Sequence, residues 1–207
     1  MSSGKYIVIE GADGTGKSTQ LDLLEKYLIE QGHEVLVIQE PGGDPLSDKL
    51  RDIIKDGSLP RDPWTNVILF TASRRAVWLQ SIKPALDAGK WVIAARNYIS
   101  TVAYQGYGEG IDIQKIIDYT RDNVDEAYLS PDQVFILTLD DQSTRDSRIV
   151  ERSAEHNLDT FESKSQDFQT AMQTGYVQFA NENNISLISA DKAISDIQQE
   201  IRESLKI

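Results

Sequence analysis

Cysteine is absent from the sequence, and the only histidines are His33 and His156. Disulfides and thiolate metal sites are therefore excluded, and a histidine-based metal centre is not expected. No apolar run approaches the roughly 20 residues that a membrane-spanning helix requires. The first five residues lead directly into an apolar run, which leaves no room for a signal peptide. We therefore expect a cytoplasmic protein without membrane partners.

Basic residues are also scarce. The sequence has 21 Lys and Arg against 33 Asp and Glu, a net charge of −12. This balance argues against proteins that coat nucleic acid or anionic membranes, and it favours small-molecule partners. We find no Pro/Gly/Ser-rich linker, repeat or low-complexity tract, so residues 1–207 are expected to form a single domain. An anionic substrate must then be held by a local cluster of Arg, Lys and backbone N–H groups.

Apolar runs typical of buried strands alternate with segments of helical periodicity. This alternation predicts a parallel sheet with helices on both faces, and ligands in such a fold bind beyond the carboxyl ends of the strands. The predicted strands are 6–9, 35–38, 91–95, 134–139 and 185–188. The predicted helices are 17–31, 46–56, 65–88, 113–127, 144–153, 161–183 and 193–205.

The most informative motif is the run Gly-Ala-Asp-Gly-Thr-Gly-Lys-Ser at 11–18, which matches the phosphate-binding pattern G-x-x-x-x-G-K-[ST]. It follows a predicted strand and opens a predicted helix, as such a loop requires. Glycines allow successive backbone N–H groups to point at a polyphosphate, and the helix adds its positive end. We expect Lys17 to reach the β- and γ-phosphates of ATP and Ser18 to ligate Mg²⁺. The predicted ATP-binding residues are Gly11, Asp13, Gly14, Thr15, Gly16, Lys17, Ser18 and Thr19.

Weaker patterns follow along the chain. Phe70 and Arg74 share a helix face, where the ring can stack on a planar base while the guanidinium donates to a carbonyl oxygen. On these residues alone, a core Phe beside a solvated Arg is favoured. Arg96 ends a predicted strand, where it either clamps a phosphoryl group or forms a structural ion pair. The Arg-bearing stretch 145–162 is interpreted as a mobile lid or as a solvated helix face.

Four motifs in order carry a specific resemblance: residues 6–19, Glu-Pro-Gly-Gly at 40–43, the segment 69–74, and Ser-Thr-Val-Ala-Tyr-Gln-Gly at 100–106. Over almost the whole chain they resemble the thymidylate kinase family of the bacterial type. The resemblance implies an α/β P-loop NTPase fold with a five-stranded parallel sheet, helices on both faces and an Arg-bearing lid at roughly 143–162. It also implies Mg²⁺-dependent transfer of the γ-phosphoryl group of ATP to dTMP, giving dTDP and ADP, by a homodimer.

The resemblance assigns roles that the residues alone leave open. Phe70 matches the ring that stacks on thymine, and Arg74 matches the donor to its O4 atom. The arginine that meets the transferring phosphoryl group is expected from the lid. The implied catalytic residues are Lys17, Arg96, Arg148 and Arg152. The implied substrate-binding residues are Asp13, Glu40, Pro41, Arg51, Phe70, Arg74, Arg96, Ser100, Thr101, Tyr104 and Gln105.

Three residues depart from the family pattern, and each change removes charge around the phosphates. Ala95 stands where family members carry an Asp that helps to hold the hydrated Mg²⁺. Thr160 stands in place of a lid arginine, and Gln39 in place of an arginine before Glu-Pro-Gly-Gly. Two alternatives stay open. One is a kinase for another nucleoside monophosphate, against which the base-binding set argues, and the other is a nucleotide-binding homologue with impaired catalysis.

Overall fold

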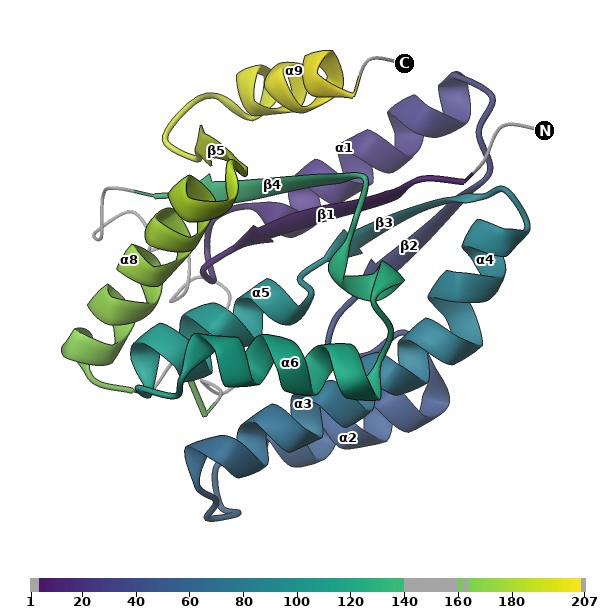
Figure 1. Ribbon diagram of the computed structural model, residues 1–207. Helices are drawn as coiled ribbons and strands as arrows, with labels where there is room; N and C mark the ends of the chain where they lie inside the picture. The colour runs from purple at the N-terminus through teal and green to yellow at the C-terminus, as the bar shows by residue number, and fades with distance from the viewer. Residues whose placement is uncertain (1–3, 140–159, 162–163, 206–207) are drawn as a thin grey trace.

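The computed structural model describes residues 4–139, 160–161 and 164–205. At its centre lies a sheet of five parallel strands in the order β2-β3-β1-β4-β5 (Figure 1). The predicted five-stranded parallel sheet is therefore confirmed. The strands are β1 (Tyr6–Gly11), β2 (Val35–Gln39), β3 (Trp91–Ala95), β4 (Gln133–Thr138) and β5 (Ser186–Ser189).

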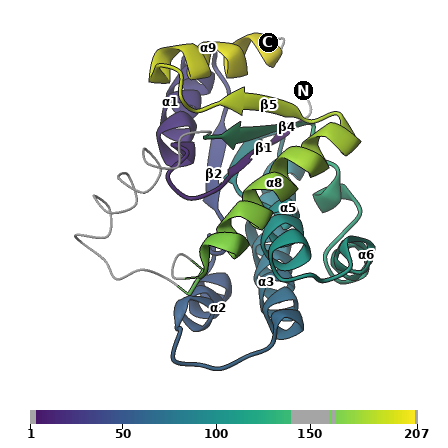
Figure 2. The same cartoon turned by 90° about the vertical axis from the view of Figure 1, so that its left-hand side faces the viewer.

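Helices cover both faces of the sheet (Figures 1 and 2). Side chains alternate along β1, so Ile7 and Ile9 join the core beneath α1 (Lys17–Glu30) and α9 (Ile194–Ser204). Tyr6 and Val8 face the opposite layer. That layer contains α2 (Pro45–Lys55), α3 (Pro63–Val77), α4 (Lys83–Asp87), α5 (Tyr98–Thr101), α6 (Ile113–Asn123) and α8 (Gln166–Asn183).

The single helix predicted over 65–88 is wrong, because the structure divides it into three pieces. Between α3 and α4 lies a π-helical segment, η1 (Trp78–Ile82). Pro84 has no N–H to donate to the carbonyl four residues earlier, so an α-helical pattern cannot continue unbroken through it. The N–H of Lys83 instead donates to the carbonyl oxygen of Trp78, five residues back.

Two further helix boundaries differ from the prediction. The helix predicted from residue 161 begins at Gln166, because the Ser165 hydroxyl caps it by accepting from the N–H of Phe168 at 3.4 Å. The helix predicted over 113–127 ends at Asn123 and is followed by a short 3₁₀ helix, η3 (Ala127–Leu129). The helix predicted over 144–153 lies outside the described residues.

The ends of β1 and β3 position the candidate site. These strands are neighbours, with Ile9 paired to Ala95, and the loops that leave them emerge side by side. After α5 the chain forms a π-helical segment, η2 (Val102–Gly108), which packs against α8. Within 4–139, 160–161 and 164–205, no helix is long and apolar enough to cross a membrane.

Candidate active site

The phosphate-binding loop joins β1 to α1. Gly11, Gly14 and Gly16 have left-handed φ values of 139°, 83° and 85°. A Cβ on Gly11 would lie 2.4 Å from the carbonyl oxygen of Leu137, whereas a Cβ on Gly16 would have no heavy atom of the described chain within 4 Å. Gly16 is the N-cap of α1 and makes no side-chain hydrogen bond to the first turn of this helix. The loop thus offers an open, donor-rich cradle that suits a phosphate group.

Two side chains hold the loop in this shape. The buried Lys17 donates through Nζ to the carbonyl oxygens of Gly11 at 3.0 Å and Ala12 at 2.8 Å. The Thr15 hydroxyl donates to the same Ala12 oxygen at 2.9 Å. The Lys17 ammonium group therefore lies inside the loop, where phosphate oxygens can take over as its acceptors. Ser18 is exposed on the first turn of α1.

Glu10, at the end of β1, places a fully buried carboxylate beneath the loop. Its Oε1 accepts from the backbone N–H groups of Asn97 at 2.7 Å and Ser100 at 3.1 Å. Its Oε2 accepts from the hydroxyls of Ser100 at 2.8 Å and Tyr176 at 2.9 Å. Because Tyr176 lies on α8 and Ser100 on α5, the carboxylate ties β1, α5 and α8 together at the carboxyl end of the sheet.

Arg96 reaches from β3 to the phosphate-binding loop. Its φ of 72° is left-handed, a conformation that is uncommon for residues other than glycine. Its Nη2 donates to Oδ1 of Asp13 at 2.7 Å, and its Nη1 donates to the carbonyl oxygen of Gly11 at 3.2 Å. Tyr104 donates to the other Asp13 oxygen at 3.1 Å. The structure thus brings Arg96, Asp13 and Tyr104 together beside the loop.

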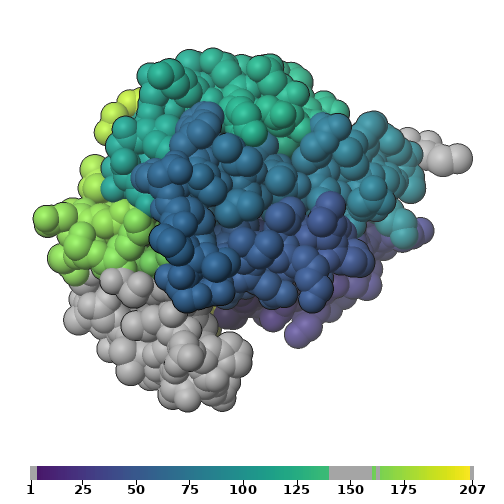
Figure 3. Space-filling view, turned by 90° about the horizontal axis from the view of Figure 1, so that it is seen from below, coloured from purple at the N-terminus to yellow at the C-terminus, as the bar shows by residue number. Residues whose placement is uncertain are grey.

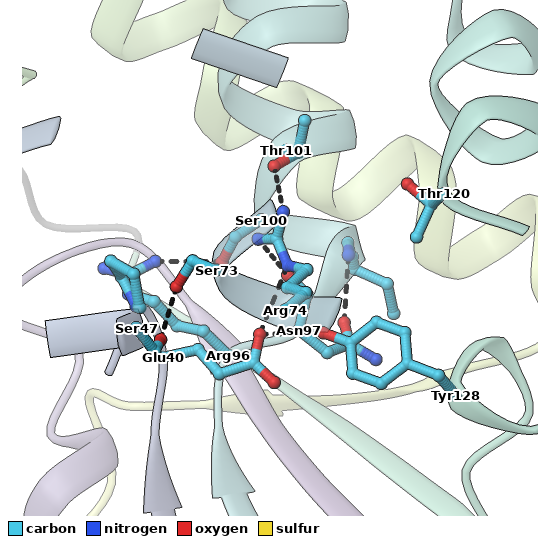
Figure 4. Close-up of polar contacts among 12 residues, drawn as sticks. Glu40, Ser47, Ser73, Arg74, Arg96, Asn97, Ser100, Thr101, Thr120 and Tyr128 are labelled. Atoms are coloured by element: carbon cyan, nitrogen blue, oxygen red, sulfur yellow. Dashed lines mark hydrogen bonds and ion pairs between the residues drawn. The ribbon is translucent and has the colours of Figure 1, made fainter. Parts of the chain in front are cut away.

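Arg74 on α3 is buried at 2% exposure and is held from three directions (Figure 4). Its Nε donates to Glu40 at 3.2 Å, its Nη1 to the Thr101 hydroxyl at 2.7 Å, and its Nη2 to the Asn97 carbonyl oxygen at 2.7 Å. Its guanidinium carbon lies 5.3 Å from the centroid of the Phe70 ring. The alternative of a solvated arginine beside a core phenylalanine is therefore wrong for this pair.

Aromatic rings gather around Phe70 and Tyr104. Phe161, which is 6% exposed, has its ring centroid 5.9 Å from that of Phe70 and 5.8 Å from that of Tyr104. Phe168 and Tyr176 of α8 approach Tyr104 at 6.1 Å and 6.4 Å. Phe161 was not among the predicted site residues, and the available signal was its place at the end of the predicted lid.

Gln105 on η2 is fully buried, yet neither atom of its amide has a hydrogen-bond partner among the described residues. Buried amides are normally paired, so this unpaired amide is an exception among the described buried residues. Arg51 of α2 lies at the Glu-Pro-Gly-Gly turn, where its Nη1 donates to the carbonyl oxygen of Pro41 at 2.6 Å. The motifs of the sequence therefore converge at one edge of the sheet.

Comparison with known proteins identifies the family. The model of the thymidylate kinase family matches residues 9–201. The chain belongs to the thymidylate kinase family. It is 35% identical over 206 residues to the thymidylate kinase of Chlorobaculum tepidum, covering 96% of this chain and 95% of that one. It is 32% identical over 203 residues to the thymidylate kinase of Halothermothrix orenii, covering 98% and 97%. The crystal structure of thymidylate kinase from Ehrlichia chaffeensis matches with a TM-score of 0.78 at 29% identity, covering 99% of both chains.

Ala95, which departs from the thymidylate kinase pattern, belongs to the apolar core beneath α1. The neighbouring carboxylates are engaged, since Glu10 holds backbone and hydroxyl donors and Asp13 holds Arg96. Among the described residues, no group of three or more His, Cys, Asp or Glu is placed to hold a metal. The donor set, with Ser18 as its exposed hydroxyl, fits a hydrated Mg²⁺ that arrives on nucleotide phosphates.

Parts of the predicted thymidylate kinase site fall outside the described residues, including Arg148, Arg152 and most of the lid. Thr160 is described, and its hydroxyl donates to the carbonyl oxygen of Lys55 at 3.1 Å, at the end of α2. Gln39 is exposed at the end of β2.

A cavity of about 300 Å³ lies between β4 and α8, beside the phosphate-binding loop. It is lined by Ala12, Thr15, Leu137, Thr138, Leu139, Gln173, Thr174, Tyr176 and Val177.

Proposed function

We propose that the protein transfers the γ-phosphoryl group of ATP to dTMP, giving dTDP and ADP. The observation that carries this proposal is the meeting of two half-sites at one edge of the sheet. One is the phosphate-binding loop with Lys17, and the other is the buried Arg74 beside the Phe70 ring. Arg96 stands between them and contacts the loop. Membership of the thymidylate kinase family supports the same reaction.

Positioning and charge neutralisation carry such a transfer. Lys17 neutralises the β- and γ-phosphates, and Arg96 clamps the acceptor phosphate close to the loop. Lid arginines, Arg148 and Arg152, complete the neutralisation. Ser18 would hold the Mg²⁺ that arrives with ATP, and the ion would supply further positive charge to the phosphate oxygens. No general base is needed, because the acceptor phosphate is already a competent nucleophile.

Base recognition follows from the donors that face the Phe70 ring. Arg74 is a donor only, so it favours a pyrimidine with a carbonyl oxygen at C4 over one with an amino group. Gln105 pairs with the remaining polar edge of the base. Asp13, Glu40, Pro41, Arg51, Ser100, Thr101 and Tyr104 complete the proposed acceptor site.

The test is ATP-dependent release of ADP with dTMP, dUMP, dCMP, dGMP and dAMP in turn, with and without Mg²⁺. We expect Mg²⁺-dependent turnover that is highest with dTMP. Binding of ATP without turnover on any acceptor would overturn the proposal and leave a nucleotide-binding homologue. Highest turnover with dCMP would contradict the base assignment alone.

Ala95→Asp is expected to lower the Mg²⁺ concentration for half-maximal rate by about tenfold, since one added charge-assisted contact is worth roughly that factor. The same change buries an unpaired carboxylate in the nucleotide-free enzyme, so we expect it to lower the free energy of unfolding by about 1–3 kcal/mol. The Mg²⁺ dependence of the rate and urea unfolding without nucleotide measure the two effects.

Ala95→Asn is the matched control for this substitution, because it adds nearly the same volume without the charge. It is expected to leave the Mg²⁺ requirement within about twofold of wild type, since a neutral amide is a weaker cation ligand. An equal Mg²⁺ requirement in all three proteins would show that the metal is held without a carboxylate at the end of β3.

We also propose that two copies associate through the face formed by α2, α3 and η1. Figure 3 shows these elements, in blue, at the centre of one face of the molecule. Large apolar side chains are exposed along them, and large exposed apolar groups favour protein contacts. They are Leu46 at 60%, Ile53 at 43%, Ile68 at 40% and Leu79 at 43% exposure. Light scattering is expected to give twice the chain mass for wild type and one chain mass for Ile68→Glu.

A further inference from the structure

We propose that Tyr128 and Glu40 are positioning residues that aim Arg74 at the base, so that a hydroxyl outside the base pocket controls recognition of thymine. The proposal rests on the proposed function, in which Arg74 donates to the base. Tyr128 lies on η3, far along the chain from every motif of the sequence, and its side chain is fully buried. Nothing in its sequence surroundings indicates a part in substrate binding.

Two hydrogen bonds link Tyr128 to Arg74 through Glu40 (Figure 4). The Tyr128 hydroxyl donates to Oε2 of Glu40 at 2.7 Å, and the same oxygen accepts from Nε of Arg74 at 3.2 Å. The other oxygen of Glu40 is buried without a hydrogen-bond partner among the described residues. Glu40 therefore has few donors compared with Glu10, and loss of the Tyr128 hydroxyl removes a large share of them.

The charges around Glu40 make this hydrogen bond important. Burial raises the pKa of the Glu40 carboxyl group to about 7, against the lowering effects of Arg74 and of the Tyr128 hydrogen bond, and the nearby Glu10 adds to the rise. Burial and the Glu40 charge also raise the pKa of Tyr128 well above its usual value. Tyr6, whose ring lies beside that of Tyr128, likewise has its pKa raised well above normal, chiefly by burial. Both phenols therefore stay protonated while Glu40 titrates.

Ionised Glu40 is the counter-ion that holds the buried Arg74. Above a pH of about 7 the carboxylate is ionised and pairs with Nε of Arg74, with the guanidinium also held by Thr101 and Asn97. Below that pH the carboxyl group gains a proton, and a buried cation loses its counter-ion. The guanidinium then keeps only its contacts with Thr101 and Asn97, so it is held less firmly in the orientation that meets the base, and dTMP binding weakens as the pH falls.

Tyr128→Phe tests the proposal, because it removes the hydroxyl and keeps the ring. Loss of a hydrogen bond to a charged group is expected to raise the pKa of Glu40 by about one pH unit. If the ionised form carries dTMP binding, the ratio of the variant's KM for dTMP to that of wild type becomes about ten at pH 6, three at pH 7.5 and one at pH 9. Titration of the dTMP phosphate cancels in this ratio. The KM for ATP is expected to stay within about twofold, because the loop is untouched.

Two companion variants make the result interpretable. Tyr107→Phe is the matched control, since the Tyr107 hydroxyl is buried without a hydrogen-bond partner in the described part of the chain, and it is expected to behave as wild type. Glu40→Gln keeps the shape of the side chain and removes its charge. It is expected to weaken dTMP binding at pH 9 by about tenfold. Its KM for dTMP is also expected to lack the part of the pH dependence in wild type that comes from titration of Glu40. Adding Tyr128→Phe to Glu40→Gln is expected to change the KM for dTMP by less than about twofold.

The outcomes separate this proposal from the proposed function. A KM ratio for Tyr128→Phe that is the same at every pH, whether one or larger, would overturn the positioning role while dTMP kinase activity stands. Equal effects of Tyr128→Phe in the wild-type and Glu40→Gln backgrounds would do the same. Absence of dTMP phosphorylation by wild type would instead remove the proposed function. Should Tyr128→Phe not fold, the pH profile of Glu40→Gln decides: a profile identical to wild type would overturn the proposal.

Discussion

Lys17→Ala is expected to lower the rate of phosphoryl transfer by about a thousandfold, because transfer depends on neutralising the charge on the migrating group. Lys17 is also the side chain that donates to two carbonyl oxygens inside the loop. Its loss removes both the charge and a restraint on the loop. Single-turnover formation of dTDP at saturating ATP measures the effect on the chemical step, apart from substrate binding.

Binding of dTMP separates a local loss from general damage. In the proposed site Arg74 and Phe70 hold the base from α3, so the affinity of Lys17→Ala for dTMP is expected to stay within about twofold of wild type. Lys26, exposed on the same helix, provides the matched control, and Lys26→Ala is expected to be fully active. Retention of more than about a tenth of the wild-type rate by Lys17→Ala would rule out the assigned role.

The sequence was most informative where function and local structure use the same residues. The phosphate-binding motif requires a strand before it and a helix after it, and both lie where they were predicted. The third strand, 91–95, was predicted with its observed bounds because it is a short apolar run that ends at a polar Arg. Local spacing also paired Phe70 with Arg74, since both lie on one helix.

Contacts between distant parts of the chain were not predictable from one sequence. Tyr128 meets Glu40 across 88 residues, and Tyr176 meets Glu10 across 166. No local pattern records such pairs, because a buried tyrosine in a short 3₁₀ helix looks like any core residue. The burial of Arg74 was missed for the same reason. Its counter-ion, Glu40, lies 34 residues earlier in the chain, and from its own helix alone Arg74 looks solvated.

Helix breaks were missed for a different reason. The π-helical segments η1 and η2 are continuous with α-helices on one or both sides, so their apolar periodicity remains almost helical. Only the hydrogen-bond pattern distinguishes them. Segment η2 carries Tyr104 and Gln105, two residues of the proposed acceptor site. A wide turn of this kind is common at functional sites.

Arg74→Ala is expected to weaken dTMP binding by about 10- to 100-fold, because it removes the proposed charged donor to the base. It also leaves the Glu40 carboxylate buried without its partner, with side-chain exposures of 3% and 1% for the two groups in wild type. Removing one member of such a pair costs about 3–5 kcal/mol in the free energy of unfolding. Arg75→Ala, the exposed neighbour on the same helix, is the matched control and is expected to change either quantity little.

The loss of stability in Arg74→Ala is expected to depend on pH, with a sign that follows from proton uptake. In wild type the folded-state pKa of Glu40, about 7, lies above its unfolded value, because burial outweighs Arg74 and Tyr128. Without Arg74 that folded-state pKa rises further. At pH 6 the carboxyl group is protonated in both proteins, so its charge adds little to the difference. Between pH 7 and the higher pKa of the variant, Glu40 is ionised in folded wild type and still protonated in the folded variant. The difference in unfolding free energy between the two proteins therefore grows by about 1.4 kcal/mol per pH unit. Urea unfolding at pH 6 and pH 8.5 measures it. A difference that is equal at both values would show that Glu40 is not the group that Arg74 stabilises.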